Sequence, residues 1–381
     1  MTKVAILGFG TVGSGVAEVL SKNSQGIARR SGGEIQVKYI LDVRDFPDSP
    51  FKDCFVKDFS IIENDPEVDV VVETIGGAKV ALEFTTRALK AGKSVVSSNK
   101  ELVATHGYEL LQLAKANGVS YLFEASVGGG IPILRPLTNC LAANEVEQIT
   151  GILNGTTNYI LTRMIKAGLT FEQALKEAQD NGYAEKDPTA DVDGHDACRK
   201  ICILSALACG QHVYPQQVPT QGIREVTLAD VAYADSCGYK IKLLGRCLRE
   251  PEGKVCAFVA PHLVSCENPL AGVEDVFNAI AVTGNAVGDV MFYGRGAGKL
   301  PTASAVVADV IDCVRHLKSD RKILFWEDAK PDYVQPWEDT PQDLFIRVGG
   351  EGDADSLFDK AQQVFPSAVR LIRKDELPGE A

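Results

Sequence analysis

The stretch VAILGFGTVGSGVAEVL, residues 4–20, decides the fold of the first third of the chain. An apolar strand runs directly into Gly8-x-Gly10-x-x-Gly13, and an amphipathic helix follows at once. Gly8 permits a tight turn, Gly10 lets a pyrophosphate approach the main chain, and Gly13 lets the helix and the strand pack closely. The start of the helix then offers free N–H groups and a positive dipole to the phosphates. We therefore expect this loop to bind a dinucleotide.

Further strands follow the glycine loop and alternate with helices. Residues 35–43 read as a strand and residues 68–77 as a buried strand, and residues 84–104 and 118–133 each carry another strand. This alternation indicates a doubly wound parallel sheet that binds its ligand at the carboxyl ends of the strands. We predict a Rossmann-type α/β domain over residues 1–135. Its cofactor-binding candidates are Gly8, Gly10, Thr11, Val12, Gly13, Thr74, Ser97 and Lys100.

Two residues near the end of the second strand give conflicting indications about the cofactor. Asp42 is placed to accept a hydrogen bond from a ribose 2′-hydroxyl, which favours NAD. Arg44 can instead meet a 2′-phosphate, which favours NADP. The sequence therefore predicts NADP or NAD and leaves the choice open.

A second domain is expected over residues 136–297, where the pattern of the chain changes. We predict a mixed sheet with few helices, an α+β unit for the substrate. The expected elements are a strand, a polar turn and a helix at 146–168, and further strands at 254–265, 276–285 and 288–296. In the turn NGTTNY, Gly155 and Thr156 can offer helical N–H groups to a substrate carboxylate, although helix capping alone would also explain the turn.

Three glycines then lead the chain back. Gly294, Gly296 and Gly298 precede a long helix that we expect to open at Pro301, because proline suits the first helical turn. We predict that residues 298–318 return to the first domain, with Gly298 beside the cofactor. The remaining residues, 319–381, predict a short C-terminal βαβ appendage with strands at 343–348 and 368–374 and a helix at 355–365.

The composition excludes several other classes of protein. Among the 381 residues, 39 lysines and arginines stand against 51 acidic residues, and no basic cluster favours a nucleic-acid partner. No apolar run approaches the roughly 20 residues that would span a membrane. The first residues read as a strand rather than a cleavable leader, so we expect a cytoplasmic protein. None of the ten cysteines forms a Cys-x-x-Cys pair, which indicates reduced, structural thiols.

The acidic stretch AEKDPTADVDGHDACRK, residues 184–200, is the strongest candidate for a reacting centre. A calcium loop aligned on Gly194 would place Lys200 where a bidentate glutamate is required, so that reading fails. The alternative is a solvated acidic turn with no catalytic role. The helix that follows opposes this reading, because it is apolar nearly all round and should be buried. Asp196 and Lys200 share one face of it. A desolvated lysine steered by an aspartate can pass a proton to or from a substrate oxygen.

The motifs together resemble those of homoserine dehydrogenases, in the order found in that family. The resemblance covers residues 1–318 and rests on GFGTVGSGV, SNKELVA, FEASVGGGIPI, GILNGTTNYIL, the acidic stretch and YGRGAGKLPTASAVVAD. It implies NAD(P)-dependent interconversion of L-homoserine and L-aspartate 4-semialdehyde, on the route to threonine, methionine and isoleucine. A related reductase of another amino-aldehyde and a nucleotide-sensing regulator are the rival readings, although the sequence shows no module for binding DNA.

The resemblance also assigns roles to single residues. Lys200 matches the proton-transfer lysine, Asp196 its acidic partner, and Lys100 a lysine between nicotinamide and substrate. Glu185 and Asp191 match carboxylates of the substrate pocket. Sodium is implied at the main-chain oxygens of Glu124, Val127, Gly129 and Ile131. Family members are usually dimers, and many carry a C-terminal regulatory ACT domain of two βαβ units. Only a remnant of such a domain is expected here.

Overall fold

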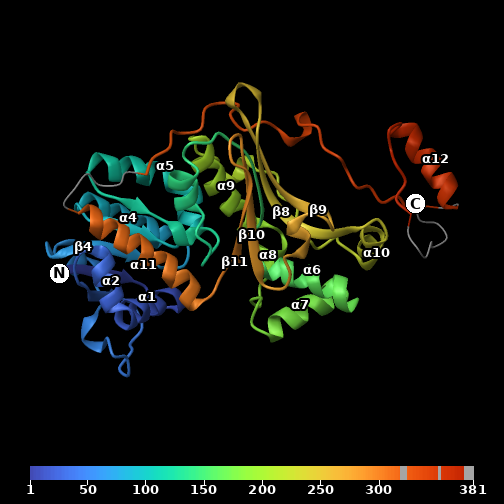
Figure 1. Ribbon diagram of the computed structural model, residues 1–381. Helices are drawn as coiled ribbons and strands as arrows, with labels where there is room; N and C mark the ends of the chain where they lie inside the picture. The colour runs from blue at the N-terminus through green and yellow to red at the C-terminus, as the bar shows by residue number, and fades with distance from the viewer. Residues whose placement is uncertain (318–323, 351–352, 373–381) are drawn as a thin grey trace.

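The computed structural model describes residues 1–317, 324–350 and 353–372 and contains two sheets. Figure 1 shows the parallel sheet with its helices on the left, the second sheet in the centre, and the C-terminal segment running across to the right. No helix of the described residues combines the length and the apolar character needed to cross a membrane.

The N-terminal sheet has six strands in the order β3-β2-β1-β4-β5-β6, and all neighbours are parallel. The prediction of a doubly wound parallel sheet is confirmed; only the two-residue strand β3 was missed. β1 and β4 are buried, as a parallel sheet covered by helices requires. Strands β2 and β3 are added on one side of β1, and strands β4 to β6 on its other side. Such sheets bind ligands at this switch point, between β1 and β4. The strands are β1 Thr2–Leu7, β2 Ile35–Leu41, β3 Phe55–Val56, β4 Val68–Glu73, β5 Ser94–Ser97 and β6 Tyr121–Leu122; the helices are α1 Thr11–Lys22, α2 Ser24–Ser31, α3 Phe59–Glu63, α4 Lys79–Lys90 and α5 Lys100–Ala116.

After the second sheet, the chain returns to the helices of this first sheet. Helix α11, Lys299–His316, begins two residues before Pro301 and packs against α1 (Figure 1). A side chain at Gly15 of α1 would lie 2.8 Å from the carbonyl oxygen of Lys299, so the two helices can approach only because this residue is glycine. The ammonium of Lys299 lies 2.7 Å from a carboxylate oxygen of Glu18.

The second sheet is wholly antiparallel, so the prediction of a mixed sheet was wrong. Its strands follow the order β11-β10-β7-β8-β9. Short turns join β8 to β9 and β10 to β11, and a short turn can connect only antiparallel strands. The expected shortage of helices was also wrong, and strand β8 was missed. The strands are β7 Val146–Ile152, β8 Tyr239–Arg249, β9 Val255–Ser265, β10 Phe277–Gly284 and β11 Gly288–Arg295; the helices between β7 and β8 are α6 Gly155–Ala167, α7 Phe171–Asp180, α8 Thr189–Val192, α9 His195–Cys209 and α10 Leu228–Ser236.

Among its described residues, the C-terminal appendage contains one α-helix, α12 Ala354–Val364, and a short 3-10 turn at Trp337–Asp339, and the predicted βαβ unit was wrong. No strand occurs at residues 343–348 or in the described part of the second predicted strand, 368–372. Leu344, Ile346 and Val369 are exposed there. A strand needs a partner with a free edge, and these segments have none within the described residues. Arg347 donates to Thr227 and Asp230 and so holds the segment near α10.

Candidate active site

The glycine loop has the geometry that a pyrophosphate requires. Gly8 adopts a φ of +90°, which a side chain would strain, and it closes the turn after β1. A Cβ at Gly13 would lie 1.9 Å from the carbonyl oxygen of Gly8, whereas a Cβ at Gly10 would meet nothing within 4 Å. Gly13 therefore allows α1 to pack closely, and Gly10 leaves its main chain open to a ligand. Thr11 and Val12 form the start of α1, where Thr11 is exposed and Val12 is half-buried.

Two of the predicted cofactor residues use their side chains inside the protein. The hydroxyl of Thr74 lies 2.9 Å from the carbonyl oxygen of Leu7 and 3.0 Å from that of Gly8, so Thr74 supports the glycine loop. The hydroxyl of Ser97 is fully buried and donates to Glu73 at 2.6 Å. Any contact that Ser97 makes with a dinucleotide would therefore use its main chain.

Asp42 and Arg44, which favoured different cofactors in the sequence, contact one another in the structure. The carboxylate of Asp42 accepts hydrogen bonds from the N–H of Phe9 and from the main chain and guanidinium of Arg44. The bond from Arg44 is the main reason that the pKa of Asp42 lies below its usual range. The Arg44 side chain is 60% exposed, and Lys57 donates to its carbonyl oxygen at 2.7 Å. Two cations thus stand at the end of β2, and the sequence analysis missed Lys57.

The acidic stretch forms the short helix α8 and the start of α9, and its predicted pair is buried. Asp196 is 3% exposed and Lys200 8%, so neither faces bulk water, as expected. The ammonium of Lys200 donates to Asp196 Oδ2 at 2.7 Å and to the carbonyl oxygen of Leu153 at 2.7 Å. An ammonium has three donors. The third N–H of Lys200 therefore has no acceptor among the described residues.

Two residues from other elements complete this cluster. Lys100, the first residue of α5, lies with its ammonium 2.5 Å from Asp196 Oδ1, and its side chain is 41% exposed. Asn154 caps α6 through its amide oxygen, which accepts from the N–H of Thr157 at 2.8 Å. The same side chain donates to Asp191 at 2.7 Å and to Asp196 at 2.8 Å. The sequence analysis noticed the capping turn but missed this second use of Asn154.

Burial and charge divide the roles of these groups. Burial lowers the pKa of Lys200, and the negative charge of Asp196 only partly offsets that effect. The pKa of Asp196 lies below its usual range because Lys200 and Lys100 together outweigh the effect of burial. Burial also disfavours the charged form of Lys100, but Asp196 raises the pKa of that lysine overall. Lys200 is thus the cation in this cluster that most readily gives up its proton.

The remaining predicted substrate residues surround the start of α6. A Cβ at Gly155 would lie 2.7 Å from the carbonyl oxygen of Val276, so only glycine fits at this helix start. The hydroxyl of Thr156 donates to the carbonyl oxygen of Tyr183 at 2.7 Å and fixes the loop that carries Glu185. The carboxylate of Glu185 is exposed and forms no hydrogen bond or ion pair within the described part of the chain. It is the one predicted carboxylate that the structure leaves outside the buried cluster.

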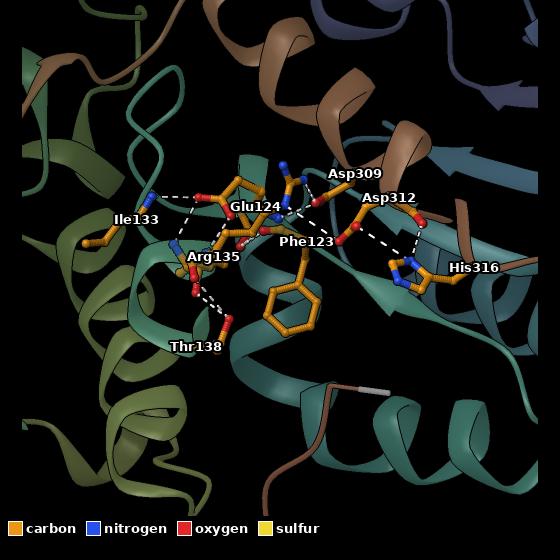
Figure 2. A network of polar contacts seen from close by, with 10 residues as sticks. Phe123, Glu124, Ile133, Arg135, Thr138, Asp309, Asp312 and His316 are labelled. Carbon is orange, nitrogen blue, oxygen red and sulfur yellow. Dashed lines mark hydrogen bonds and ion pairs between the residues drawn. The ribbon is translucent and has the colours of Figure 1, made fainter. Parts of the chain in front are cut away.

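The predicted cation loop is held by a separate buried network, shown in Figure 2. The carboxylate of Glu124 accepts hydrogen bonds from the N–H groups of Ile133, Leu134 and Arg135 at 2.6, 2.9 and 2.8 Å. Asp309 of α11 accepts from the N–H of Glu124 at 2.8 Å and pairs with the guanidinium of Arg135. The side chain of Glu124 is therefore committed, so a cation could meet only its carbonyl oxygen, which accepts from the N–H of Val127 at 3.4 Å.

Comparison with known proteins identifies the family. A family model described as "Homoserine dehydrogenase, NAD binding domain" matches residues 8–124, and one described as "Homoserine dehydrogenase" matches residues 132–311. A homoserine dehydrogenase of Pseudomonas aeruginosa is 43% identical over 354 residues, which cover 91% of this chain and 81% of the relative. The chain belongs to the homoserine dehydrogenase family. It is an NAD(P)-dependent oxidoreductase, and the resemblance stated from the motifs is confirmed.

Solved structures of this family share the fold. The crystal structure of a homoserine dehydrogenase from Thiobacillus denitrificans superposes with a TM-score of 0.81 at 41% identity, covering 91% of this chain and 81% of that one. A hyperthermophilic archaeal homoserine dehydrogenase in complex with NADPH superposes with a TM-score of 0.69 at 30% identity, covering 84% of this chain and 99% of that one. The two-sheet arrangement with a Rossmann-like N-terminal unit is therefore a property of the family.

Proposed function

We propose that Lys200 is the proton donor and acceptor when this enzyme interconverts L-homoserine and L-aspartate 4-semialdehyde. The observation that carries the proposal is the buried ammonium of Lys200, which has two fixed acceptors and one free N–H. Its lowered pKa suits exchange of a proton with an alcohol or aldehyde oxygen. A nicotinamide bound at the glycine loop supplies or accepts the hydride.

The rest of the cluster orients the substrate in this proposal. Asp191 and Glu185 hold its ammonium by charge, and the free N–H groups of Gly155 and Thr156 at the start of α6 hold its carboxylate. Asp196 fixes the position of Lys200, and Lys100 pairs with Asp196 between the nicotinamide and the substrate. We assign the dinucleotide to residues 1–135 and 298–318, the substrate and subunit contacts to residues 136–297, and no catalytic part to residues 319–381.

Replacement of Lys200 by alanine tests the role of this ammonium. We expect kcat for aspartate 4-semialdehyde reduction to fall about a thousandfold, because general acid catalysis contributes up to about that factor. Lys176→Ala is the matched control: Lys176 also pairs with an aspartate four residues away, but that pair is exposed. Near-normal turnover of Lys200→Ala, with an unchanged thermal unfolding midpoint, would reject the assignment.

The cofactor is NADP or NAD, and we propose that Arg44 and Lys57 meet the 2′-phosphate when NADP binds. The exposed guanidinium of Arg44 supports this, and the archaeal relative was solved with NADPH. Arg44→Ala should weaken NADPH binding about tenfold and leave NADH binding unchanged, as loss of one partly exposed phosphate contact implies. Fluorescence titration of both cofactors measures this. Equal NADPH affinity in the two proteins would remove Arg44 from the site.

Three further properties of the family are proposed for this chain. Sodium fits the loop of Glu124, Val127, Gly129 and Ile131: among the described residues, no hydrogen bond reaches the carbonyl oxygens of the last three. A homodimer through the second sheet is supported by the exposed apolar side chains on its edge strand β11, Met291 and Tyr293. A cytoplasmic place in threonine, methionine and isoleucine biosynthesis agrees with ten free cysteines.

A further inference from the structure

A buried carboxyl group lies at the ligand edge of the parallel sheet, outside the residues discussed so far as catalytic. Glu73 is the last residue of β4 and is 0% exposed. It pairs in register with Ser97, the last residue of β5. No lysine, arginine or histidine forms an ion pair with Glu73 among the described residues. Burying a carboxyl group without a cationic partner costs free energy, so the presence of Glu73 at this position needs an explanation.

The carboxyl group of Glu73 ties two loops together. One oxygen accepts from the N–H of Ile75, in the loop after β4, at 2.7 Å. The other accepts from the hydroxyl of Ser97 at 2.6 Å. The Ser97 oxygen in turn accepts from the N–H of Asn99 at 3.0 Å. A chain of hydrogen bonds thus runs from Glu73 to the residue directly before Lys100.

The side chain of Asn99 also joins the loop after β4 to the start of α5. Its amide nitrogen donates to the carbonyl oxygens of Ile75 at 3.1 Å and Gly77 at 2.8 Å. Its amide oxygen caps α5 by accepting from the N–H of Leu102 at 3.0 Å. The first residue of the capped helix is Lys100, whose ammonium lies 2.5 Å from Asp196. The start of α5 is therefore fixed by the group that Glu73 holds.

We propose that Glu73 is a positioning residue for the reaction: through Ser97 and Asn99, its carboxyl group sets the start of α5 and so places Lys100 against Asp196. The inference rests on the proposed roles of Lys100 and Lys200. It assigns a function to a side chain that touches neither substrate nor cofactor. Loss of the carboxyl group shifts the start of α5, and Lys100 then screens Asp196 less well.

The ionisation of Glu73 gives this arrangement a signature that a purely structural residue would lack. Burial raises the pKa of Glu73 to about 7, although the bonds from Ser97 and Ile75 favour its charged form. The phenol of Tyr121 on β6 is the titratable neighbour, and its own pKa lies well above the usual range because it is buried. The ionised carboxylate accepts from Ser97, whereas the protonated carboxyl group can donate to it. The direction of that bond thus changes with pH.

Replacement of Glu73 by glutamine, which keeps its shape, is the first part of the test. We expect kcat for aspartate 4-semialdehyde reduction to fall about tenfold, as a small displacement of a charged group near the reacting atoms implies. The pH profile of kcat should also lose one ionisation near pH 7. Asp69→Asn is the matched control, because Asp69 is a carboxylate near the other end of the same strand. That variant should keep the wild-type profile.

A double-mutant cycle is the second part of the test. If Glu73 acts through Lys100, Glu73→Gln should change kcat less than about twofold when Lys100 is already alanine. NADPH affinity and the thermal unfolding midpoint are measured for each variant. Equal losses in both backgrounds, or a pH profile that still shows the ionisation in Glu73→Gln, would overturn the inference.

If Glu73→Gln does not fold, a substitution at the next residue of the hydrogen-bond chain still tests the proposal. Ser97→Ala removes only the bridging hydroxyl and should lower kcat by a similar factor; in a folded double variant, the two losses should not add. Normal turnover of Ser97→Ala would overturn the proposal. Full turnover of Lys200→Ala would instead reject the proposed function, and that result is obtained without any Glu73 variant.

Discussion

The enzyme contains two largely buried ionic networks, one around Asp196 and one around Glu124, and they differ in how their charged groups are paired. In the proposed catalytic cluster, the two cations Lys100 and Lys200 pair with Asp196, while Asn154 links Asp191 to Asp196, and one of these cations is partly exposed. In the loop network of Figure 2, the single cation Arg135 contacts two carboxylates of α11, while the third carboxylate, Glu124, is satisfied by main-chain N–H groups. The first network can therefore exchange a proton, whereas the second network holds a loop in place.

The two networks also differ in how many fixed hydrogen-bond partners each charged group has. Three N–H groups fix Glu124 in one geometry, and burial raises the pKa of Asp309 to about 7 although Arg135 opposes this. Lys200 has only two fixed acceptors, so its third donor is available to a ligand. A network whose carboxylates are held by fixed donors stabilises a conformation. A network with one free donor can serve catalysis.

The largest effect expected from this comparison is on stability. Arg135→Met should lower the free energy of unfolding by about 3 kcal/mol, because it leaves Asp309 buried without its cation. Lys100→Met should lower it by less than about 1 kcal/mol, because Lys100 is partly exposed and Asp196 keeps Lys200. Denaturant unfolding of both variants at pH 8 measures the difference.

A second substitution checks the cause of the Arg135 effect. Asp309→Asn removes the unpaired charge but keeps an oxygen for the N–H of Glu124. Arg135→Met with Asp309→Asn should therefore be more stable than Arg135→Met alone. If adding Asp309→Asn gives no recovery, the loss comes from packing of the arginine stem and not from a buried charge. Equal losses in Arg135→Met and Lys100→Met would show that the two networks do not differ as argued.

The sequence predicted those features that depend on spacing along the chain. The three glycines of the first loop stand at fixed positions around one turn, and Asp196 and Lys200 stand four apart on an apolar helix. Both features were confirmed in geometry. Their chemistry could be read because the α-helix and the strand-turn-helix place such residues without help from the rest of the fold.

The features that failed depend on contacts between distant segments. The pairing of Lys100 with Asp196 requires two separate units to meet, and the double use of Asn154 joins segments that lie 37 and 42 residues apart. No local pattern in the sequence predicts either contact. The burial of Glu73 is likewise set by the helices that cover the sheet. The C-terminal strands failed for a related reason: an alternating pattern predicts a strand only where another edge is present to pair with it.

The smallest effect expected is a shift in the pH dependence of turnover, and it tests the catalytic network directly. Asp196→Asn removes the negative charge that raises the pKa of Lys200 against the effect of burial. The pKa of Lys200 should therefore fall further. Homoserine oxidation needs the neutral amine and semialdehyde reduction needs the ammonium, so both limbs of the kcat profile should move to lower pH together. Profiles measured in both directions at saturating cofactor decide the matter. A shift to higher pH, or movement of one limb only, would mean that the titrating group is not Lys200, and the catalytic network would then resemble the loop network in holding structure alone.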